Sequence, residues 1–470
     1  MPLPLKLVAF ERYMLDDDRS SHPMAFRLKL AFSGRFDEDA FRAAVKTAVA
    51  RHPLFRAHIC SDRPRALEWT DAADAETYVD IADIDTPVTF PGQEQIDLRN
   101  ETGVRIWVRT GPDATEIRFQ LHHSCCDGIG AYRFAEDLLC AYDQQVHPEA
   151  GRSEYRPLDS QRLARRTQFG LSWWRVMLRL PLEIWGIVVG MFTFFVGRPV
   201  ALQSPQQPNL SEDEQLRLID YASHWFDEET ATRLRAAARS AGVTLNDLLL
   251  RDLFLAIRDW NGQHDPRTRR RAIRLSVPMD LRGPGDEQMP AANVVAMIFV
   301  DRRPAIFPNP RWLLKSINWE MRFIKWGRFG IAFVRACGLV DLIPGGLRLL
   351  SRANRCYATA VLSNMGRPFS DSKLARQGEK IITGDLVLEE VESAPPVRPY
   401  TSAALTCLSY AGRFALVMNY DRHHFTTESA EALLDTITQQ IGASASDSGA
   451  ATAPLRDVSS PQAAALDARK

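Results

Sequence analysis

One stretch of the chain joins a strand, a tight turn and a helix without a linker. The segment TEIRFQLHH (115–123) alternates apolar and polar residues, which predicts a half-buried strand. Asp127 and Gly128 form a turn pair, and the segment that follows, IGAYRFAEDLLCAYDQQ (129–145), has helical spacing. The sequence HHSCCDG (122–128) therefore lies at a strand end, directly before a helix.

Two further patterns indicate a mixed α/β chain. VRIWVRT (104–110) also alternates, and GPDA separates it from the strand at 115–123, which predicts a hairpin. A strand at 24–34 precedes FDEDAFRAAVKTAVARHPLF (36–55), whose apolar residues share one helix face: Phe41, Ala44, Val45, Ala48 and Val49. FDEETATRLRAAARSAGVTLNDLLLRDLFLAI (226–257) begins with the same three residues, and this weak echo suggests a duplicated fold.

Composition excludes some classes of function. The 470 residues contain 58 Lys plus Arg and 58 Asp plus Glu, so no global charge draws the protein to nucleic acid. The seven cysteines are an odd number without regular spacing, which points to free thiols in a reducing compartment. The N-terminal residues show no apolar signal segment, so we expect a cytoplasmic protein.

The segment LPLEIWGIVVGMFTFFVG (180–197) is nearly all apolar but slightly short for a membrane span, and it contains Pro181 and Glu183. Tryptophan and arginine residues precede it: Trp173, Trp174, Arg162, Arg165, Arg166, Arg175 and Arg179. One interpretation is a buried or bridging helix. Another is a helix at a membrane surface, in which case 173–197 would bind lipid and the protein would be peripheral. A true span ranks third.

A zinc site at HHSCCDG is disfavoured by geometry. Adjacent residues on a strand point to opposite faces, so His122 and His123 do not easily share one ion. No CxxC or HxxxH pair completes a ligand set, so we expect no metal.

The same stretch allows two kinds of catalysis. A nucleophilic cysteine at 125 or 126 would need a base and a lowered pKa, although paired cysteines are more often small packing residues. His123 continues the apolar face of Ile117, Phe119 and Leu121 and so points inward. An inward histidine beside a tight loop and a helix start suits a general base.

HHSCCDG matches HHxxxDG, the motif of the chloramphenicol-acetyltransferase-like acyltransferases. That superfamily includes condensation domains, wax-ester synthase/diacylglycerol acyltransferases and alcohol acyltransferases. Four other segments resemble family motifs in the expected order: VTLNDLLL (243–250), VPMDLRG (277–283), AANVVAMIFV (291–300, with Ala292 in place of the usual Gly) and LSNMG (362–366). In pieces, the resemblance spans residues 5 to 440.

The resemblance implies an α/β (α+β) fold of two chloramphenicol-acetyltransferase-like lobes. Each lobe is expected to have a mixed sheet with helices, and an active-site tunnel would run between them. We expect an N-terminal lobe at 1–160, a connector at 161–215, a C-terminal lobe at 216–442 and a disordered tail at 443–470.

The resemblance also assigns roles to residues. His123 would be the catalytic base, and His122 would be a motif residue that faces away. Asp127 would be structural and would pair with Arg282 of the second lobe. Gly128 would free backbone N–H groups for an oxyanion.

Two of the family segments and one basic run also have ordinary structural explanations. Ser363 and Asn364 would add oxyanion or acceptor-site donors, although SNMG is also a common turn. Asn246 and Asp247 in the 243–250 segment could simply cap or pack a helix. RTRRRAIR (267–274) could bind the phosphates of coenzyme A or be an ordinary solvated basic loop.

The expected function is acyl transfer to a hydroxyl or amine, with O-acyl transfer favoured. No bound cofactor is expected, and acyl-CoA or an acyl-carrier thioester would be the co-substrate. The partners would then be small-molecule donor and acceptor, with an acyl carrier protein as an additional candidate. The alternatives are a freestanding condensation enzyme fed by carrier proteins and a non-catalytic binding protein on the same fold.

Overall fold

The computed structural model describes residues 3–61, 67–72, 75–149, 151–171, 173–206, 208, 211, 221–283, 285–303, 309–353 and 355–446, with only the backbone at 61, 173, 175 and 176. The last described helix, α11, spans Thr427–Ser446 and so continues past the expected start of a tail at 443. Residues 447–470 lie outside the described residues.

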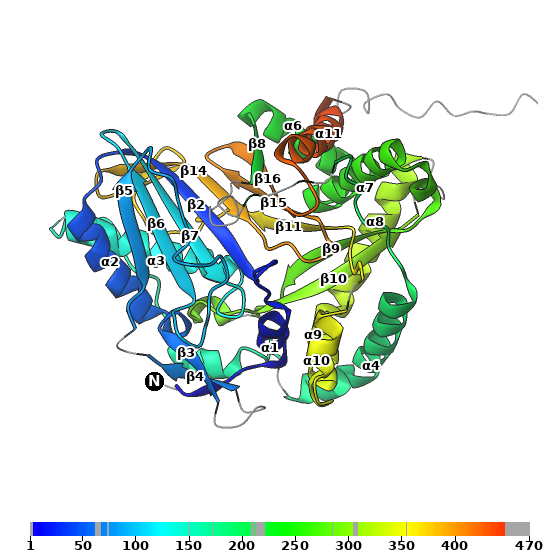
Figure 1. The fold of residues 1–470 in the computed structure, drawn as a ribbon, viewed down its shortest axis with the longest axis horizontal. Helices are drawn as coiled ribbons and strands as arrows, with labels where there is room; N and C mark the ends of the chain where they lie inside the picture. The colour runs from blue at the N-terminus through cyan, green and yellow to red at the C-terminus, as the bar shows by residue number, and fades with distance from the viewer. Residues whose placement is uncertain are drawn as a thin grey trace, which may run out of the picture.

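Two mixed sheets organise the molecule (Figure 1). The first has the order β12 (Arg376–Gln377), β13 (Lys380–Thr383), β14 (Leu386–Ala394), β2 (Ala25–Gly34), β7 (Ala114–His122), β6 (Val104–Thr110) and β5 (Tyr78–Asp83). The second has the order β10 (Val295–Arg302), β9 (Ile273–Asp280), β11 (Ala360–Gly366), β15 (Ala403–Tyr410), β16 (Arg413–Tyr420) and β8 (Ala222–Phe226). A small sheet contains β1 (Leu5–Lys6), β4 (Leu67–Asp71) and β3 (Ala57–Ser61).

Helices cover the two sheets. The first sheet carries α2 (Glu38–Arg51) and α3 (Gly128–Val146), whereas α6 (Glu228–Ser240), α7 (Leu245–His264) and α11 lie on the second. Helix α8 (Pro310–Gly327) packs beside α7 on the second lobe. The remaining helices are α1 (Ala9–Asp17), α4 (Trp173–Val196), α9 (Gly330–Asp341) and α10 (Gly346–Ser351). Each sheet has its own buried apolar cluster, so the two-lobed architecture is present.

The elements predicted around HHSCCDG are confirmed. Strands β6 and β7 form the expected antiparallel hairpin, with Ile106 opposite Phe119. Helix α3 begins at Gly128, and Asp127 is its N-cap because its carboxylate accepts from the backbone of Gly130. The predicted apolar face of α2 is buried throughout.

The echo between the two halves corresponds to a repeated local structure. Phe226 ends β8, and Asp227 caps α6 through the backbone of Thr230, as Asp37 caps α2 through Ala40. The stretch 226–257 contains two helices, because the chain turns at Gly242 with a positive φ of 68° and starts again at α7.

The expected boundary at 216 lies outside the described residues, but one later segment of the chain crosses to the first sheet. Strand β14 comes from the second half of the sequence but pairs with β2 of the first sheet, with Val391 opposite Leu30. This pairing covers what would otherwise be an exposed strand edge. Residues 376–394 therefore belong to the N-terminal sheet, a pairing that strand periodicity does not reveal.

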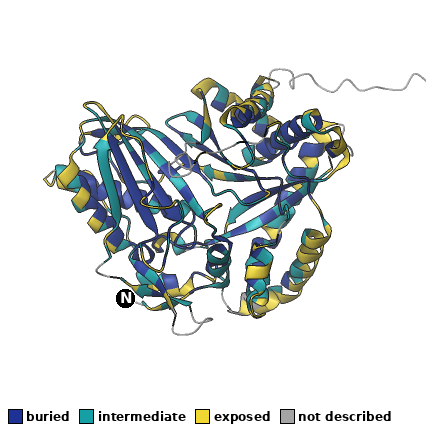
Figure 2. Cartoon of the chain, in the orientation of Figure 1, coloured by how far each residue is buried: buried dark blue, intermediate teal, exposed yellow. Residues whose placement is uncertain are grey.

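Helix α4 lies on the outside of the molecule (Figures 1 and 2). Within the described residues, Met177–Val196 is the one helical stretch long and apolar enough to cross a membrane, and only 6% of it is buried. The interpretation of this segment as a buried core helix is therefore wrong. Glu183 is nevertheless buried, because it forms an ion pair with Arg335 of α9.

Candidate active site

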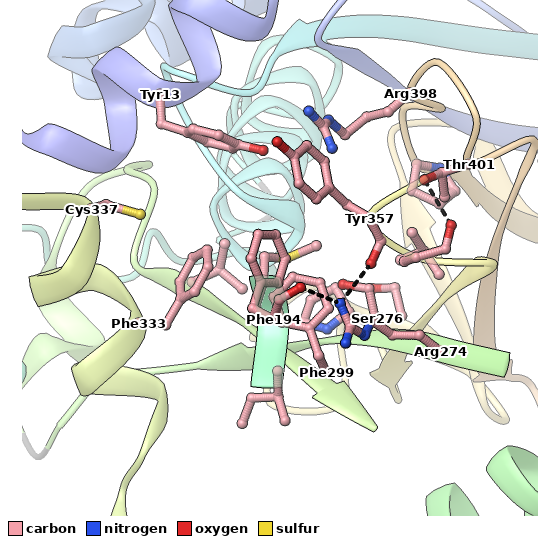
Figure 3. A pocket seen from close by; sticks show the side chains of 18 of the residues that line it. Tyr13, Phe194, Arg274, Ser276, Phe299, Phe333, Cys337, Tyr357, Arg398 and Thr401 are labelled. Atoms are coloured by element: carbon pink, nitrogen blue, oxygen red, sulfur yellow. Dashed lines mark hydrogen bonds between the residues drawn. The ribbon is translucent and has the colours of Figure 1, made fainter. Parts of the chain in front are cut away.

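A cavity of about 500 Å³ lies between the two lobes. The N-terminal half contributes His123, Gly128 and Phe26, and the C-terminal half contributes β9, β10, α9 and the strand end at Ser363. Figure 3 shows the part of the cavity lined by Phe194, Phe299 and other mainly apolar side chains. A cavity therefore lies between the lobes, where the tunnel was expected.

One wall of this cavity is a face of the β9–β10 pair. Its residues form four successive cross-strand pairs: Asp280 with Val295, Pro278 with Met297, Ser276 with Phe299, and Arg274 with Asp301. The six residue steps from the first pair to the last correspond to roughly 20 Å. The Asp280 end adjoins Arg282 and the HHSCCDG loop, whereas Arg274 closes the far end.

Arg274 is buried, and each nitrogen of its guanidinium has a hydrogen-bond partner. It pairs with Asp301 at 2.5 and 2.7 Å and donates to the main-chain carbonyls of Thr193 and Phe194. These carbonyls lie at the C-terminus of α4, where a cation is favoured by the helix dipole. Arg274 is therefore not available for coenzyme A phosphates. The exposed arginines at 267 and 269–271 keep that role as a prediction.

His123 lines the cavity just after the end of β7. Its backbone N–H donates to the carbonyl of Met24, and its ring packs 5.1 Å from the ring of Phe26. Burial lowers the pKa of His123 below its ordinary value of 6.5, although the charge of Asp127 and a hydrogen bond from the ring to the residue's own carbonyl raise it. The ring is therefore neutral at neutral pH, as a base must be.

The two ring nitrogens of His123 have different surroundings. Asn293 Nδ2 donates to the carbonyl oxygen of His123 at 2.7 Å and lies 3.2 Å from Nδ1, so both His123 atoms lie next to the same amide nitrogen. The amide N–H of Asn293 can only donate, so it bonds Nδ1 only in the Nε2–H tautomer. With the ring proton on Nδ1 and directed at the carbonyl of the same residue, the lone pair is on Nε2. Within the described residues, the hydrogen-bond contacts of the His123 ring are on the Nδ1 side, and the residue lines the cavity, which leaves Nε2 available for a substrate.

His122 is fully buried and points away from the cavity. Its Nδ1 accepts from the backbone of Ser124, and its Nε2 lies 3.4 Å from the carboxylate of Asp18. Burial raises the pKa of Asp18, but the hydrogen bond and charge of His122 outweigh this effect and hold the pKa below its usual value. His122 thus ties the loop to the N-terminal segment.

The ion pair expected between Asp127 and Arg282 is present and buried. The two oxygens of Asp127 lie 2.9 and 3.1 Å from the guanidinium, in a bidentate arrangement. The same carboxylate accepts from the backbone of Gly130 and Val294, and Arg282 also donates to the carbonyl of Ala292. Burial raises the pKa of Asp127, but Arg282 more than offsets this and keeps the pKa below its ordinary value.

Gly128 lies where the loop meets the second lobe. A Cβ at this position would approach the Cε of Met365 to 2.5 Å, so a side chain would push against the SNMG strand end. Gly128 and Ile129 line the cavity in the first turn of α3, where backbone N–H groups lack helical partners. An anion at this position would be stabilised by the helix N-terminus.

Ser363 and Asn364 also line the cavity, at the end of β11. The hydroxyl of Ser363 lies 3.5 Å from the sulfur of Met365, a weak contact. The side-chain oxygen of Asn364 accepts from Gly366, as in a turn, and its nitrogen lies 3.5 Å from Asn246. Their proposed role as donors stays a prediction. Ser363 is the better candidate, because its hydroxyl makes only the weak contact with the sulfur of Met365.

The residues of the 243–250 segment have a structural explanation. Thr244 caps α7, and Asp247 accepts from the backbone and hydroxyl of Thr244 in a capping box. Asp247 also accepts from Asn318 of α8. Helix capping therefore accounts for these two side chains.

Cys125 and Cys126 are packing residues in this structure. Both are completely buried, and burial raises the pKa of each thiol well above its ordinary value. A Cβ on Gly103 would lie 2.1 Å from the sulfur of Cys125, which shows how tightly that thiol is enclosed. In the described parts of the chain, no group of three His, Cys, Asp or Glu side chains could hold a metal ion.

The model of the Condensation domain family matches residues 13–268, more than half of the chain. The chain belongs to this family of acyltransferases. This assignment agrees with the resemblance read from HHSCCDG and places the protein in the chloramphenicol-acetyltransferase-like superfamily.

Curated relatives give less detail about function. An uncharacterized Mycobacterium tuberculosis protein, Rv2305, is 25% identical over 273 residues, which are 56% of this chain and 59% of Rv2305. A probable non-canonical nonribosomal peptide synthetase of Salinispora arenicola, CymA, is 31% identical over 133 residues, which are 26% of this chain and 2% of CymA. The chain thus spans less than two thirds of these relatives.

Solved structures support the fold. The starter condensation domain of rhizomide synthetase aligns with a TM-score of 0.65 at 12% identity and covers 95% of both chains. The X-domain from teicoplanin biosynthesis aligns with a TM-score of 0.62 at 16% identity and covers 96% of both.

Sequence reasoning missed two residues that shape the site. Asn293 holds the carbonyl of His123, and Asp18 holds His122. A signal for Asn293 was present, because it lies in the segment 291–300 that resembles the family's G-N strand. Asp18 had no such signal, since only the fold brings the end of α1 to the loop.

We expect Asp127→Asn and Arg282→Ala each to lower the melting temperature and the activity together. Removal of one partner from a buried ion pair typically costs about 3–5 kcal/mol, because the other charge stays unpaired. The double variant should cost no more than the sum of the singles. Thermal unfolding and activity assays check this. A different result would assign Asp127 to the chemistry: Asp127→Asn protein that is inactive but equally stable, together with Arg282→Ala protein that is unchanged in both activity and stability.

The double variant Cys125→Ser, Cys126→Ala should keep most of the activity, because both thiols are enclosed and protonated. Chelators should have no effect. Activity assays with EDTA and with a mild thiol reagent in a Cys140-free background measure this. Inhibition by either agent would restore the metal or thiol interpretation.

Proposed function

We propose that this protein transfers an acyl group from a thioester to a hydroxyl or amine, with His123 as general base. The observation that carries the proposal is the different setting of the two ring nitrogens. Nδ1 and the carbonyl of His123 both lie next to the Asn293 amide, and Nε2 has no partner among the described residues on a side chain that lines the cavity. A histidine presented in this way can accept a proton from a bound substrate.

The chemistry follows from this placement. The acceptor oxygen or nitrogen attacks the thioester carbonyl while Nε2 of His123 takes its proton. The resulting imidazolium is stabilised by the nearby charge of Asp127 and by the carbonyl that accepts from Nδ1. Collapse of the tetrahedral intermediate breaks the carbon–sulfur bond, and the imidazolium returns its proton to the departing thiolate. The base is regenerated, and the products are an ester or amide and a free thiol.

The negative charge of the intermediate needs donors on its other side. Gly128 and Ile129 line the cavity in the first turn of α3, and their N–H groups lie at the positive end of the helix dipole. Ser363 lines the cavity from the second lobe and would supply a hydroxyl donor. This arrangement gives the oxyanion contacts from both lobes.

The cavity favours a substrate with a hydrocarbon chain. Beyond His123 its lining is mainly apolar and includes Met14, Ile187, Met297 and Phe333. We therefore favour a hydroxyl on a lipid-like acceptor over a peptidyl amine, and acyl-CoA over a carrier-bound donor. The starter condensation domain of rhizomide synthetase, solved in complex with C8-CoA, is a fold relative with such a donor. An acyl carrier protein remains the alternative donor.

The proposed location is the cytoplasm, with the protein peripheral at a membrane. All seven cysteines are unpaired, which suits a reducing compartment. The exposed apolar helix α4 supports the membrane part.

His123→Ala should abolish transfer without lowering the melting temperature, since loss of a general base typically costs about 10² to 10⁴ in rate. The assay incubates purified protein with labelled acyl-CoAs and mixed alcohol, glyceride and amine acceptors and identifies the products by mass. His122→Ala is the matched control and should reduce activity less, since His122 faces away from the cavity. Activity of His123→Ala within a few-fold of wild type would rule out this mechanism.

A further inference from the structure

Helix α4 has two apolar faces with different surroundings. Its inner residues line the cavity: Gly186, Ile187, Gly190, Met191, Thr193, Phe194 and Phe195. Its outer residues are open to solvent, with Val188 exposed to 61% and Phe192 to 66%. The single helix is therefore the wall between the cavity and the surroundings.

Helix α8 adds a row of tryptophans to this surface. Trp312, Trp319 and Trp326 are each exposed to 65% or more, and their seven-residue spacing places them along one side of the helix. Lys315 and Arg322 are also exposed, each three residues after a tryptophan. No described carboxylate forms an ion pair with either of them, and Lys315 lies 5.5 Å from the ring of Trp312.

The exposed faces of the two helices are continuous. Phe323 of α8 lies 6.3 Å from the ring of Trp185 on α4 and contacts the rings of Trp319 and Trp326. Beside α4, the ends of α9 and α10 expose Leu339, Leu342, Ile343 and Leu349. We call the outer faces of α4, α8, α9 and α10 together the apolar face.

The charge on this face has one sign. Among the described side chains of the four helices, the exposed charged residues are Arg311, Lys315, Arg322, Lys325 and Arg348, and no acidic residue is exposed. The acidic groups are turned in, since Glu183 pairs with Arg335, Asp341 with Arg12, and Glu320 with Arg302. The whole chain has zero net charge, so this asymmetry is local.

The positive charges and the tryptophans on the apolar face favour one kind of binding partner. Tryptophan favours the headgroup level of a bilayer, and each basic residue near an anionic membrane adds attraction. A second copy of this chain packed symmetrically on the same face would bring like charges together. An anionic lipid surface satisfies both the apolar and the basic residues.

We propose that the apolar face docks on an anionic bilayer, with α4 in the interface, and that the hydrocarbon substrate reaches His123 from the lipid past α4. The docking part stands on the surface alone. The route deepens the proposed function and depends on it. It identifies the acceptor as a membrane-resident amphiphile rather than a solute.

Vesicle flotation of the full chain tests the docking. Wild type should float with phosphatidylcholine vesicles containing phosphatidylglycerol, and less with phosphatidylcholine alone. Val188→Asp with Phe192→Asp should abolish flotation, because it places two negative charges on the exposed side of α4. Neither side chain lines the cavity, so the cavity itself is left unchanged. Lys315→Gln with Arg322→Gln should weaken binding to anionic vesicles by about 30-fold, since each basic residue near the surface contributes roughly five-fold.

The matched control is Arg233→Gln with Arg239→Gln, two exposed arginines on α6, remote from the apolar face. This variant should bind as wild type does, and thermal unfolding shows that all variants fold. Docking is overturned if wild type does not float, or if the α4 variant floats equally well. It is also overturned if wild type is an oligomer in solution that the α4 variant converts to monomer, without any vesicle binding.

A second readout separates the route from the chemistry. The α4 variant should lose most transfer to an acceptor embedded in anionic vesicles but keep transfer to a short soluble alcohol. Equal rates for wild type and variant with the embedded acceptor would overturn the route. Absence of transfer by wild type with both acceptors would instead count against the proposed function, while flotation would still decide the docking.

Discussion

The geometry at His123 depends on the buried ion pair between Asp127 and Arg282. Asp127 starts α3 as its N-cap, and the same carboxylate accepts from Gly130 in the first lobe and Val294 in the second. One side chain therefore fixes the direction of the helix, the course of the HHSCCDG loop and the contact between the lobes. The guanidinium of Arg282 neutralises this carboxylate where water does not reach it, so Asp127 stays charged and stays in place.

The same contacts orient the His123 ring. The residue after Ala292, whose carbonyl Arg282 binds, is Asn293, and its amide holds the carbonyl beside the His123 ring. The ion pair and His123 are thus joined through two adjacent residues of the second lobe. At the far end of the cavity, Arg274 and Asp301 anchor the C-terminus of α4, so buried arginines define both ends of the apolar wall.

The elements around the site could be predicted from the sequence because their signals are local. The alternation of apolar and polar residues predicted the β6–β7 hairpin, and the Asp127–Gly128 pair indicated the start of α3. The Asp127–Arg282 contact spans 155 residues and came from family resemblance, since no local pattern encodes it. The pairing of β14 with β2 and the placement of Asp18 beside His122 had no signal at all, because both depend on how distant segments meet. The tryptophans of α8 were visible in the sequence, but their exposure was not.

We propose that His123 is held as a neutral base with its proton on Nδ1 and its lone pair on Nε2. Nitrogen-15 NMR of the histidine rings, with His123→Gln used for assignment, measures both the tautomer and the pKa. The account predicts the Nδ1–H form at neutral pH and a pKa below the ordinary 6.5, because burial disfavours the imidazolium. An Nε2–H tautomer, or a pKa above 6.5, would contradict it.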